Sequence, residues 1–179
     1  MKRLLLALPL LVFVVIGLIA VVMLNASSRG ERDSQAIGFS MTGSTLPEIT
    51  MPRLGGGAVI DLSAYRGQVF AINVFASWCA PCKLESPSIE RLSERLPVIG
   101  INYRDSDDDA RRFLDQFGNP YALIGKDLDG NTSIKLGVHG LPETFIIGAD
   151  GEILYHLQGP LMGAELEGPL GLVLDEAGV

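Results

Sequence analysis

The chain has 179 residues, a formal net charge of −7 at pH 7 and only two cysteines. A chain of this length suits one ordinary domain with an appendage. The acidic balance, with no basic run, argues against a nucleic-acid partner. Two cysteines are also too few for a scaffold held together by disulfides.

The first predicted element is an apolar run, Leu4–Leu24, that contains no charged residue. At about 1.5 Å rise per residue, a helix of this length can cross a hydrocarbon core of roughly 30 Å. We therefore predict an uncleaved signal anchor over residues 1–25, with a cleaved signal peptide as the alternative. Lys2 and Arg3 favour a cytoplasmic N-terminus. The remainder of the chain is then expected on the other side of that membrane, in the periplasm or another exocytoplasmic space.

Residues 26–45 are polar and rich in Ser, Gly and Arg, which predicts a flexible tether. The domain is expected to occupy residues 46–179. It begins with two short strand-like stretches around Gly55–Gly57. The next stretch, Gln68–Ala76, is apolar on both faces, as expected of a central buried strand.

Helix and strand patterns alternate after this strand. The stretch Pro81–Arg95 has helical spacing, with Leu84, Ile89 and Leu92 as apolar positions and Pro87 as a predicted kink. The order predicts an α/β fold, a mixed central sheet flanked by helices. The later predicted elements are a strand at 97–103, a helix at 106–118, a strand at 121–124, a helical turn at 132–136, a β-hairpin at 144–157 and an amphipathic helix at 164–177, irregular at Gly168-Pro169.

The two cysteines stand in the motif Trp78-Cys79-Ala80-Pro81-Cys82, between the buried strand and the following helix. This arrangement is typical of a thioredoxin-like redox site. Cys79 would lie at the helix N-terminus, where unsatisfied N–H groups and the helix dipole stabilise a thiolate, so it is the candidate nucleophile. Cys82, one turn later, is the candidate resolving thiol. A purely structural disulfide is the alternative, although it would close a very small loop.

Two other interpretations of the cysteines are disfavoured. A zinc site needs four ligands, and His139 and His156 are isolated from each other with no second cysteine pair. Covalent haem attachment requires Cys-x-x-Cys-His, and Lys83 stands at the histidine position. We therefore expect no metal and no cofactor beyond the Cys79–Cys82 pair, and each histidine is interpreted as an ordinary residue. Trp78 either fills the core or tunes the pair.

Three further motifs, Gly100–Asp105, Gly118–Tyr121 and Gly137–Phe145, add to the Cys-x-x-Cys context and the N-terminal apolar run. Together they resemble the CcmG/DsbE group, the membrane-anchored thioredoxin-like proteins of cytochrome c maturation. The resemblance covers about Leu46 to Leu161. It implies a thioredoxin-like fold and a periplasmic thiol:disulfide oxidoreductase.

The resemblance also implies roles for single residues. Pro142 would be a cis-proline that faces the Cys79–Cys82 pair, although the sequence leaves the isomer of the Leu141–Pro142 bond open. Glu85 matches an acidic residue that tunes thiol acidity. Glu143 matches the Pro-Glu pair of the family, near the site.

A position six residues before the first cysteine carries a buried, proton-relaying aspartate in thioredoxins. Here it is Asn73, which does not titrate. Proton transfer to and from the resolving thiol is therefore expected to need Glu85 or Glu143. The alternative for Glu85 is a solvated helix residue without a role. The alternative for Glu143 is likewise a residue with no role in the chemistry.

The partners follow from the resemblance alone. The substrate would be apocytochrome c or a haem-ligation protein, and a membrane thiol donor of the DsbD/CcdA type would resupply electrons. Two alternatives stay open, because Ala80-Pro81 does not fix the direction of exchange. One is a general exocytoplasmic disulfide reductase or oxidase. The other is an apocytochrome-binding chaperone module with secondary redox activity.

Overall fold

The computed structural model describes residues 41–179. Its main strands are β3 Phe70–Phe75, β4 Val98–Tyr103, β5 Leu123–Asp127, β6 Glu143–Ile147 and β7 Ile153–Gln158. They form a five-stranded sheet in the order β5-β4-β3-β6-β7. The pairs β3–β4 and β4–β5 are parallel, whereas the pairs β3–β6 and β6–β7 are antiparallel. The predicted mixed central sheet is confirmed.

The central strand β3 is buried along all six of its residues. Its sequence is apolar on both faces except for Asn73, and helices or loops cover both faces. Its neighbour β6 begins the predicted hairpin with β7, which is also confirmed. Because β3 ends at Phe75, the cysteine motif starts at the carboxyl end of the central strand.

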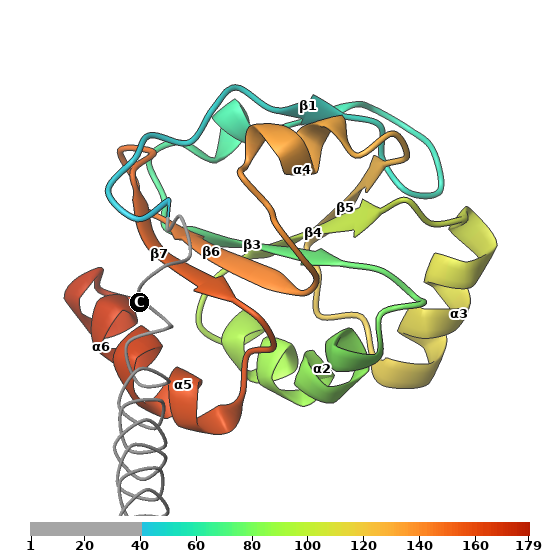
Figure 1. The fold of residues 1–179 in the computed structure, drawn as a ribbon. Helices are drawn as coiled ribbons and strands as arrows, with labels where there is room; N and C mark the ends of the chain where they lie inside the picture. The colour runs from blue at the N-terminus through green and yellow to red at the C-terminus, as the bar shows by residue number, and fades with distance from the viewer. Residues whose placement is uncertain (1–40) are drawn as a thin grey trace, which may run out of the picture. The chain divides into compact units, whose positions relative to one another are not determined.

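Helices and the N-terminal part of the domain form layers on the two faces of the sheet (Figure 1). On one face lie α2, α3, α5 and α6. On the other face lie α4, the small hairpin β1–β2 and the 3₁₀ helix η2. Their bounds are β1 Thr50–Met51, β2 Ile60–Asp61, η2 Leu62–Tyr65, α2 Ala80–Ser93, α3 Asp107–Phe117, α4 Asn131–Lys135, α5 Gly163–Glu167 and α6 Pro169–Glu176.

The buried face of α2 differs from the predicted one. Leu84 was expected among its apolar contacts, but 67% of its surface is exposed. The helix instead buries Cys82, Glu85, Ile89 and Leu92, which recur at a spacing of three to four residues and so share one face. This register turns a carboxyl, rather than a leucine, toward the sheet.

The predicted C-terminal helix is two helices, α5 and α6, separated at Gly168. Pro169 occupies the first turn of α6, where its missing N–H costs no intrahelical hydrogen bond. The irregularity predicted at Gly168-Pro169 is therefore confirmed, and it lets both short helices pack Leu166 and Leu170 against the same core.

Segments outside the five strands cover part of each sheet edge. On the β7 edge, Gly43 N–H donates to the Ile153 carbonyl at 2.8 Å, and Ile153 N–H donates to Ser44 at 2.8 Å. On the β5 edge, Leu54 N–H donates to Ile124 at 2.8 Å, and Lys126 N–H donates to Pro52 at 2.8 Å. Residues 41–45, placed in the tether by the sequence, thus hydrogen-bond to the domain.

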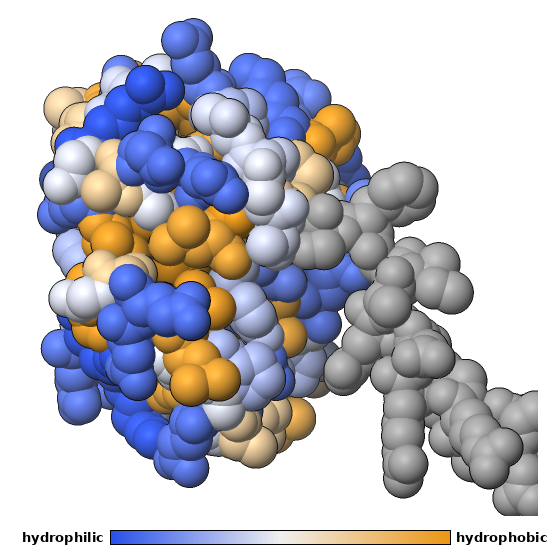
Figure 2. Space-filling view, turned by 90° about the vertical axis from the view of Figure 1, so that its left-hand side faces the viewer, coloured by the Kyte–Doolittle hydropathy of each residue, from blue (hydrophilic) through white to orange (hydrophobic). Residues whose placement is uncertain are grey.

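On the side of the molecule where β7 lies, apolar residues reach the surface in the middle of the face and are surrounded by polar ones (Figure 2).

Within residues 41–179, no helix is both long enough and apolar enough to cross a membrane. The predicted anchor at Leu4–Leu24 and residues 26–40 of the predicted tether lie outside the described residues.

Candidate active site

Cys79 and Cys82 form a disulfide at the start of α2. Cys79 is the N-cap of the helix, and its Sγ accepts a hydrogen bond from the Cys82 N–H at 3.2 Å. Pro81 lies in the first helical turn. Both cysteines are almost fully buried, at 4% and 2% exposed. A thiolate at Cys79 would therefore face the free N–H groups and the positive end of the helix dipole.

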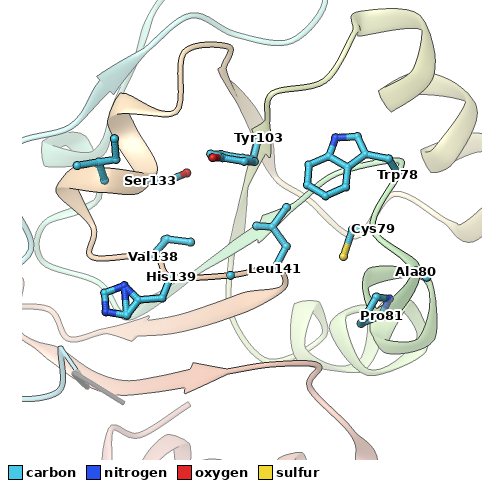
Figure 3. Close-up of a pocket in the computed structure, with 11 residues that line it drawn as sticks. Trp78, Cys79, Ala80, Pro81, Tyr103, Ser133, Val138, His139 and Leu141 are labelled. Atoms are coloured by element: carbon cyan, nitrogen blue, oxygen red, sulfur yellow. The ribbon is translucent and has the colours of Figure 1, made fainter. Parts of the chain in front are cut away.

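A groove with a volume of about 450 Å³ opens beside Cys79. Figure 3 shows Cys79 and Leu141, from two different elements, directed toward the same space. The rim includes Ile134 of α4, which is 68% exposed. The other lining residues are Trp78, Ala80, Pro81, Tyr103, Ser133, Val138, His139 and Gly140.

Trp78 belongs to the wall of this groove and not to the core. Its side chain is 57% exposed, which rules out the core-filling interpretation. The indole N–H donates to the Arg104 carbonyl at 3.3 Å, and the ring meets Tyr103 edge-on at 6.3 Å between centroids. Arg104 itself has a positive φ of 44°, an uncommon conformation for a side-chain-bearing residue. The loop after β4 thus holds the tryptophan beside the disulfide.

Asp105 anchors the segment that leads into Cys79. Its carboxylate accepts hydrogen bonds from the Ser77 N–H at 2.7 Å and the Ser77 hydroxyl at 2.9 Å. Asn102 and the Ser106 N–H donate to the same carboxylate, at 3.1 Å and 2.9 Å. The sequence analysis did not single Asp105 out. The available signal was its place just after β4, because adjacent parallel strands end at the same edge of a sheet.

The Leu141–Pro142 peptide bond is cis. Leu141 lines the groove, and the carbonyl of Pro142 accepts a hydrogen bond from the Gly159 N–H at 2.9 Å. The structure therefore brings the loop before β6 and the Cys79–Cys82 disulfide to the same groove, with Leu141 as the residue that faces it.

Glu85 is buried behind the disulfide, one turn after Cys82 on the same face of α2. Only 1% of it is exposed, so the solvated-residue interpretation is wrong. Its two oxygens accept hydrogen bonds from Asn73 Nδ2 at 2.9 Å and from the Leu161 N–H at 2.8 Å. Burial raises the pKa of this carboxyl to about 7, although both hydrogen bonds oppose the rise.

Asn73 connects Glu85 to further polar groups. The Tyr121 hydroxyl donates to Asn73 Oδ1 at 2.7 Å, and Asn73 Nδ2 lies 3.1 Å from the Thr144 hydroxyl oxygen, to which it donates. Burial, and next the charge of Glu85, raise the pKa of Tyr121 well above its usual value. Tyr121 therefore stays neutral. Sequence reasoning noted only that Asn73 cannot titrate and did not find Tyr121.

Glu143 lies on the opposite face of the sheet from Glu85. In the β3–β6 pairing, Thr144 is opposite Asn73 and Glu143 is opposite Val74, and successive residues of a strand point to opposite faces. Glu143 Oε1 accepts hydrogen bonds from the N–H groups of His139 at 2.8 Å and Gly140 at 2.9 Å. The structure therefore connects Glu143 to the groove wall and not to the α2 side of the cysteine pair.

The second oxygen of Glu143 lies 2.7 Å from Nε2 of His156. Both side chains are buried. His156, interpreted from the sequence as an ordinary residue, is thus the partner of a buried carboxylate. Among residues 41–179, no group of three or more His, Cys, Asp or Glu side chains is arranged to hold a metal ion.

A Cys-x-x-Cys disulfide at a helix N-terminus, faced by a cis X-Pro loop on this sheet, defines the class of thioredoxin-like disulfide oxidoreductases. Comparison with known proteins agrees. Residues 42–156 match the AhpC/TSA family. The chain belongs to this family and, within it, to the thiol:disulfide interchange proteins of the DsbE and CycY type, so the resemblance seen in the sequence is confirmed.

Two relatives and one solved structure illustrate the similarity. CycY of Rhizobium leguminosarum bv. viciae is 42% identical over 130 residues, which cover 72% of this chain and 67% of CycY. DsbE of Pseudomonas fluorescens biotype C is 38% identical over 154 residues, covering 86% and 83%. A crystal structure from Chlorobium tepidum, assigned as a thiol:disulfide interchange protein DsbE, superposes with a TM-score of 0.67 at 27% identity, covering 76% and 96%.

Proposed function

We propose that this disulfide oxidoreductase works as a reductant on the exocytoplasmic side of a bacterial inner membrane. Its substrate would be a disulfide in apocytochrome c or in a haem-ligation partner. Residues 1–25 would anchor it through Leu4–Leu24, residues 26–40 would link the anchor to the domain, and a membrane thiol donor of the DsbD/CcdA type would recharge it. The family membership and the apolar N-terminal run support this assignment.

The observation that carries the proposal is the groove beside Cys79. A small-molecule redox partner does not need an apolar groove between Trp78 and the Leu141 loop. An extended polypeptide can lie in such a groove, with main-chain hydrogen bonds to the loop before Pro142 and apolar side chains against Trp78 and Leu141. The groove thus favours a protein disulfide as substrate.

The proposed chemistry is a pair of thiolate exchanges. In the reduced protein, the Cys79 thiolate attacks one sulfur of the substrate disulfide, the bond between the two substrate sulfurs breaks, and the other sulfur leaves as a thiolate while the mixed disulfide forms. The Cys82 thiolate then attacks Cys79 Sγ, which releases the substrate sulfur held in the mixed disulfide as a second thiolate and forms the Cys79–Cys82 disulfide. Two electrons pass to the substrate. A dithiol donor must return two electrons before the next turnover.

Cys82 must lose a proton before it attacks. We assign this proton to Glu85, which is buried with Cys82 on one face of α2 and has a pKa raised to about 7 by burial. A group with a pKa near the working pH is the most effective proton acceptor. Glu85→Gln is expected to shift the pH titration of the thiols. An unchanged titration would remove Glu85 from the mechanism.

The direction of exchange is tested by the reduction potential of the Cys79–Cys82 pair, measured in a glutathione or dithiothreitol redox buffer. A value near or below about −200 mV, the range of thioredoxins and glutaredoxins, is expected of a reductant. A value near about −120 mV, the range of a strong periplasmic oxidant, would overturn the proposal.

The biological role is tested by cytochrome c maturation in a strain that lacks this protein. The wild-type chain is expected to restore maturation, and Cys79→Ser is expected to abolish it, because the variant cannot form the mixed disulfide. Full maturation with Cys79→Ser would instead support the chaperone alternative.

A further inference from the structure

The first residue of the described chain is connected to the groove by a row of hydrogen bonds. The Met41 N–H donates to Nδ1 of His156 at 3.1 Å. A backbone N–H can only donate, so Nδ1 is an acceptor and carries no proton. In the neutral imidazole the single proton is then on Nε2, which donates to Glu143 Oε2 at 2.7 Å. Met41 thereby selects the tautomer that serves Glu143.

The row continues from Glu143 into the wall of the groove. Its other oxygen accepts the backbone N–H groups of His139 and Gly140, at 2.8 Å and 2.9 Å. These two residues line the groove beside Leu141. The carboxylate therefore takes three donors, two from the groove wall and one from the histidine.

The imidazole of His156 is held in position as well as in one tautomer. Its side chain is fully buried, and the ring stacks on Phe145 with 4.1 Å between centroids and 12° between planes. The Met41 side chain also reaches the loop before the groove, because a Cβ built on Gly137 would lie 3.1 Å from its sulfur. Neither contact touches a cysteine.

We propose that His156 is a positioning residue for disulfide exchange: it holds Glu143 so that residues 138–141 keep the shape that binds a polypeptide next to Cys79. His156 sets the affinity for the polypeptide and takes no part in the sulfur chemistry. This inference rests on the proposed role of the groove as the polypeptide site.

The test compares substitutions of the full-length chain. His156→Phe keeps the stacking on Phe145 but removes both ring nitrogens. His156→Gln keeps a side-chain donor that can reach Glu143 and serves as the conservative rescue. Tyr155→Phe is the matched control, because Tyr155 is adjacent in β7 and its hydroxyl bonds to Glu165.

The readouts separate binding from chemistry. The electron donor is the reduced protein, the substrate is a synthetic peptide with an intramolecular Cys-x-x-Cys disulfide, and the aromatic disulfide dithiobis(nitrobenzoic acid) is the small-molecule reference. For His156→Phe, the KM for the peptide is expected to rise about 5- to 30-fold, the factor that corresponds to about 1–2 kcal/mol. The rate with dithiobis(nitrobenzoic acid) and the reduction potential should not change. His156→Gln should restore most of the affinity, and Tyr155→Phe should match the wild type.

An unchanged peptide KM in His156→Phe would overturn the inference. If the wild-type protein itself reduced the peptide no faster than it reduced dithiobis(nitrobenzoic acid), the proposed role of the groove would fail. In that case the hydrogen-exchange rates of the His139 and Gly140 amides still test whether His156 positions the groove wall. Exchange should be faster in His156→Phe than in the wild type, and equal rates would refute the positioning role.

Discussion

Two buried glutamates flank the central sheet, and they differ in what surrounds them. Glu85 and Glu143 are each 1% exposed, and they lie on opposite faces of the sheet. Around Glu85, the Asn73 amide and the two hydroxyls bonded to it, those of Tyr121 and Thr144, can act either as hydrogen-bond donors or as acceptors. Around Glu143, every partner in the hydrogen bonds described above is a donor. The comparison shows that burial alone does not make a carboxyl a proton carrier, because the partners must also be able to reverse.

The network at Glu85 can reverse. If Glu85 takes a proton, the Asn73 amide can turn over, and the hydroxyls of Tyr121 and Thr144 can exchange donor and acceptor roles. The Leu161 N–H continues to donate to the other oxygen. Both protonation states of Glu85 thus have partners, which suits a group that exchanges a proton during each cycle.

The network at Glu143 cannot reverse. Two of its donors are backbone N–H groups, and the third is the His156 nitrogen whose proton is fixed by the Met41 N–H. A proton on either oxygen of Glu143 would point at a group that is itself a donor, so it would have no acceptor. The sequence suggested either glutamate for proton transfer. The contacts favour Glu85 for it, whereas those of Glu143 lead to the groove wall.

The largest expected effect is the loss of Glu143. Glu143→Ala should lower the free energy of unfolding by about 3–5 kcal/mol, because it leaves three buried donors without their acceptor, at about 1–3 kcal/mol each. Denaturant titration measures this change. Glu143→Gln should recover little, because its amide N–H would point at one of the three donors. A Glu143→Gln variant as stable as the wild type would show that this network can reverse after all.

A pH series tests Glu85. Its pKa is raised in the folded state from 4.5 to about 7, so the folded domain binds more protons than the unfolded chain in this range. The free energy of unfolding should therefore fall as the pH rises from 4.5 to about 7, by roughly 3 kcal/mol from this group.

Glu85→Gln should lack this decline, with the oxidised protein measured at each pH by denaturant titration. Glu90→Gln, an exposed position on the same helix, is the control and should keep the wild-type slope. If the slope of Glu85→Gln equals that of the wild type, Glu85 does not titrate in this window.

The smallest expected effect concerns Tyr121. Tyr121→Phe removes the hydroxyl that donates to Asn73 but keeps the ring stacked on Phe75 at 4.8 Å. The expected cost is about 1 kcal/mol of unfolding free energy, the typical net value of one hydrogen bond. In the double variant with Glu85→Gln the two costs should not add, since both residues bond to Asn73. Strict additivity would mean that Tyr121 does not belong to the Glu85 network.

The predictions that succeeded rest on signals within one stretch of chain. Local apolar patterns or the positions of Gly and Pro predict each of these features: the buried strand before Cys79, the hairpin at β6–β7 and the break at Gly168. Leu84 shows the limit, because its apolar side chain suggested a buried position, whereas the register of α2 buries the neighbouring Glu85.

The missed features join residues that are distant in sequence. Asp105 bonds to Ser77 across 28 positions, and Tyr121 bonds to Asn73 across 48. No periodicity in a single stretch encodes such pairs, because they depend on which strands become neighbours. Likewise, only the register of β3 with β6 shows that Glu143 and Glu85 lie on opposite faces of the sheet.

The partial coverage of both sheet edges has a consequence for the proposed exchange with polypeptide substrates. An open strand edge is a template on which another polypeptide can assemble and begin a fibril. Here residues 43–45 occupy part of the β7 edge, and residues 52–54 occupy part of the β5 edge. The polypeptide substrate proposed above would thus be held by its cysteine while the domain offers it few templates for polymerisation.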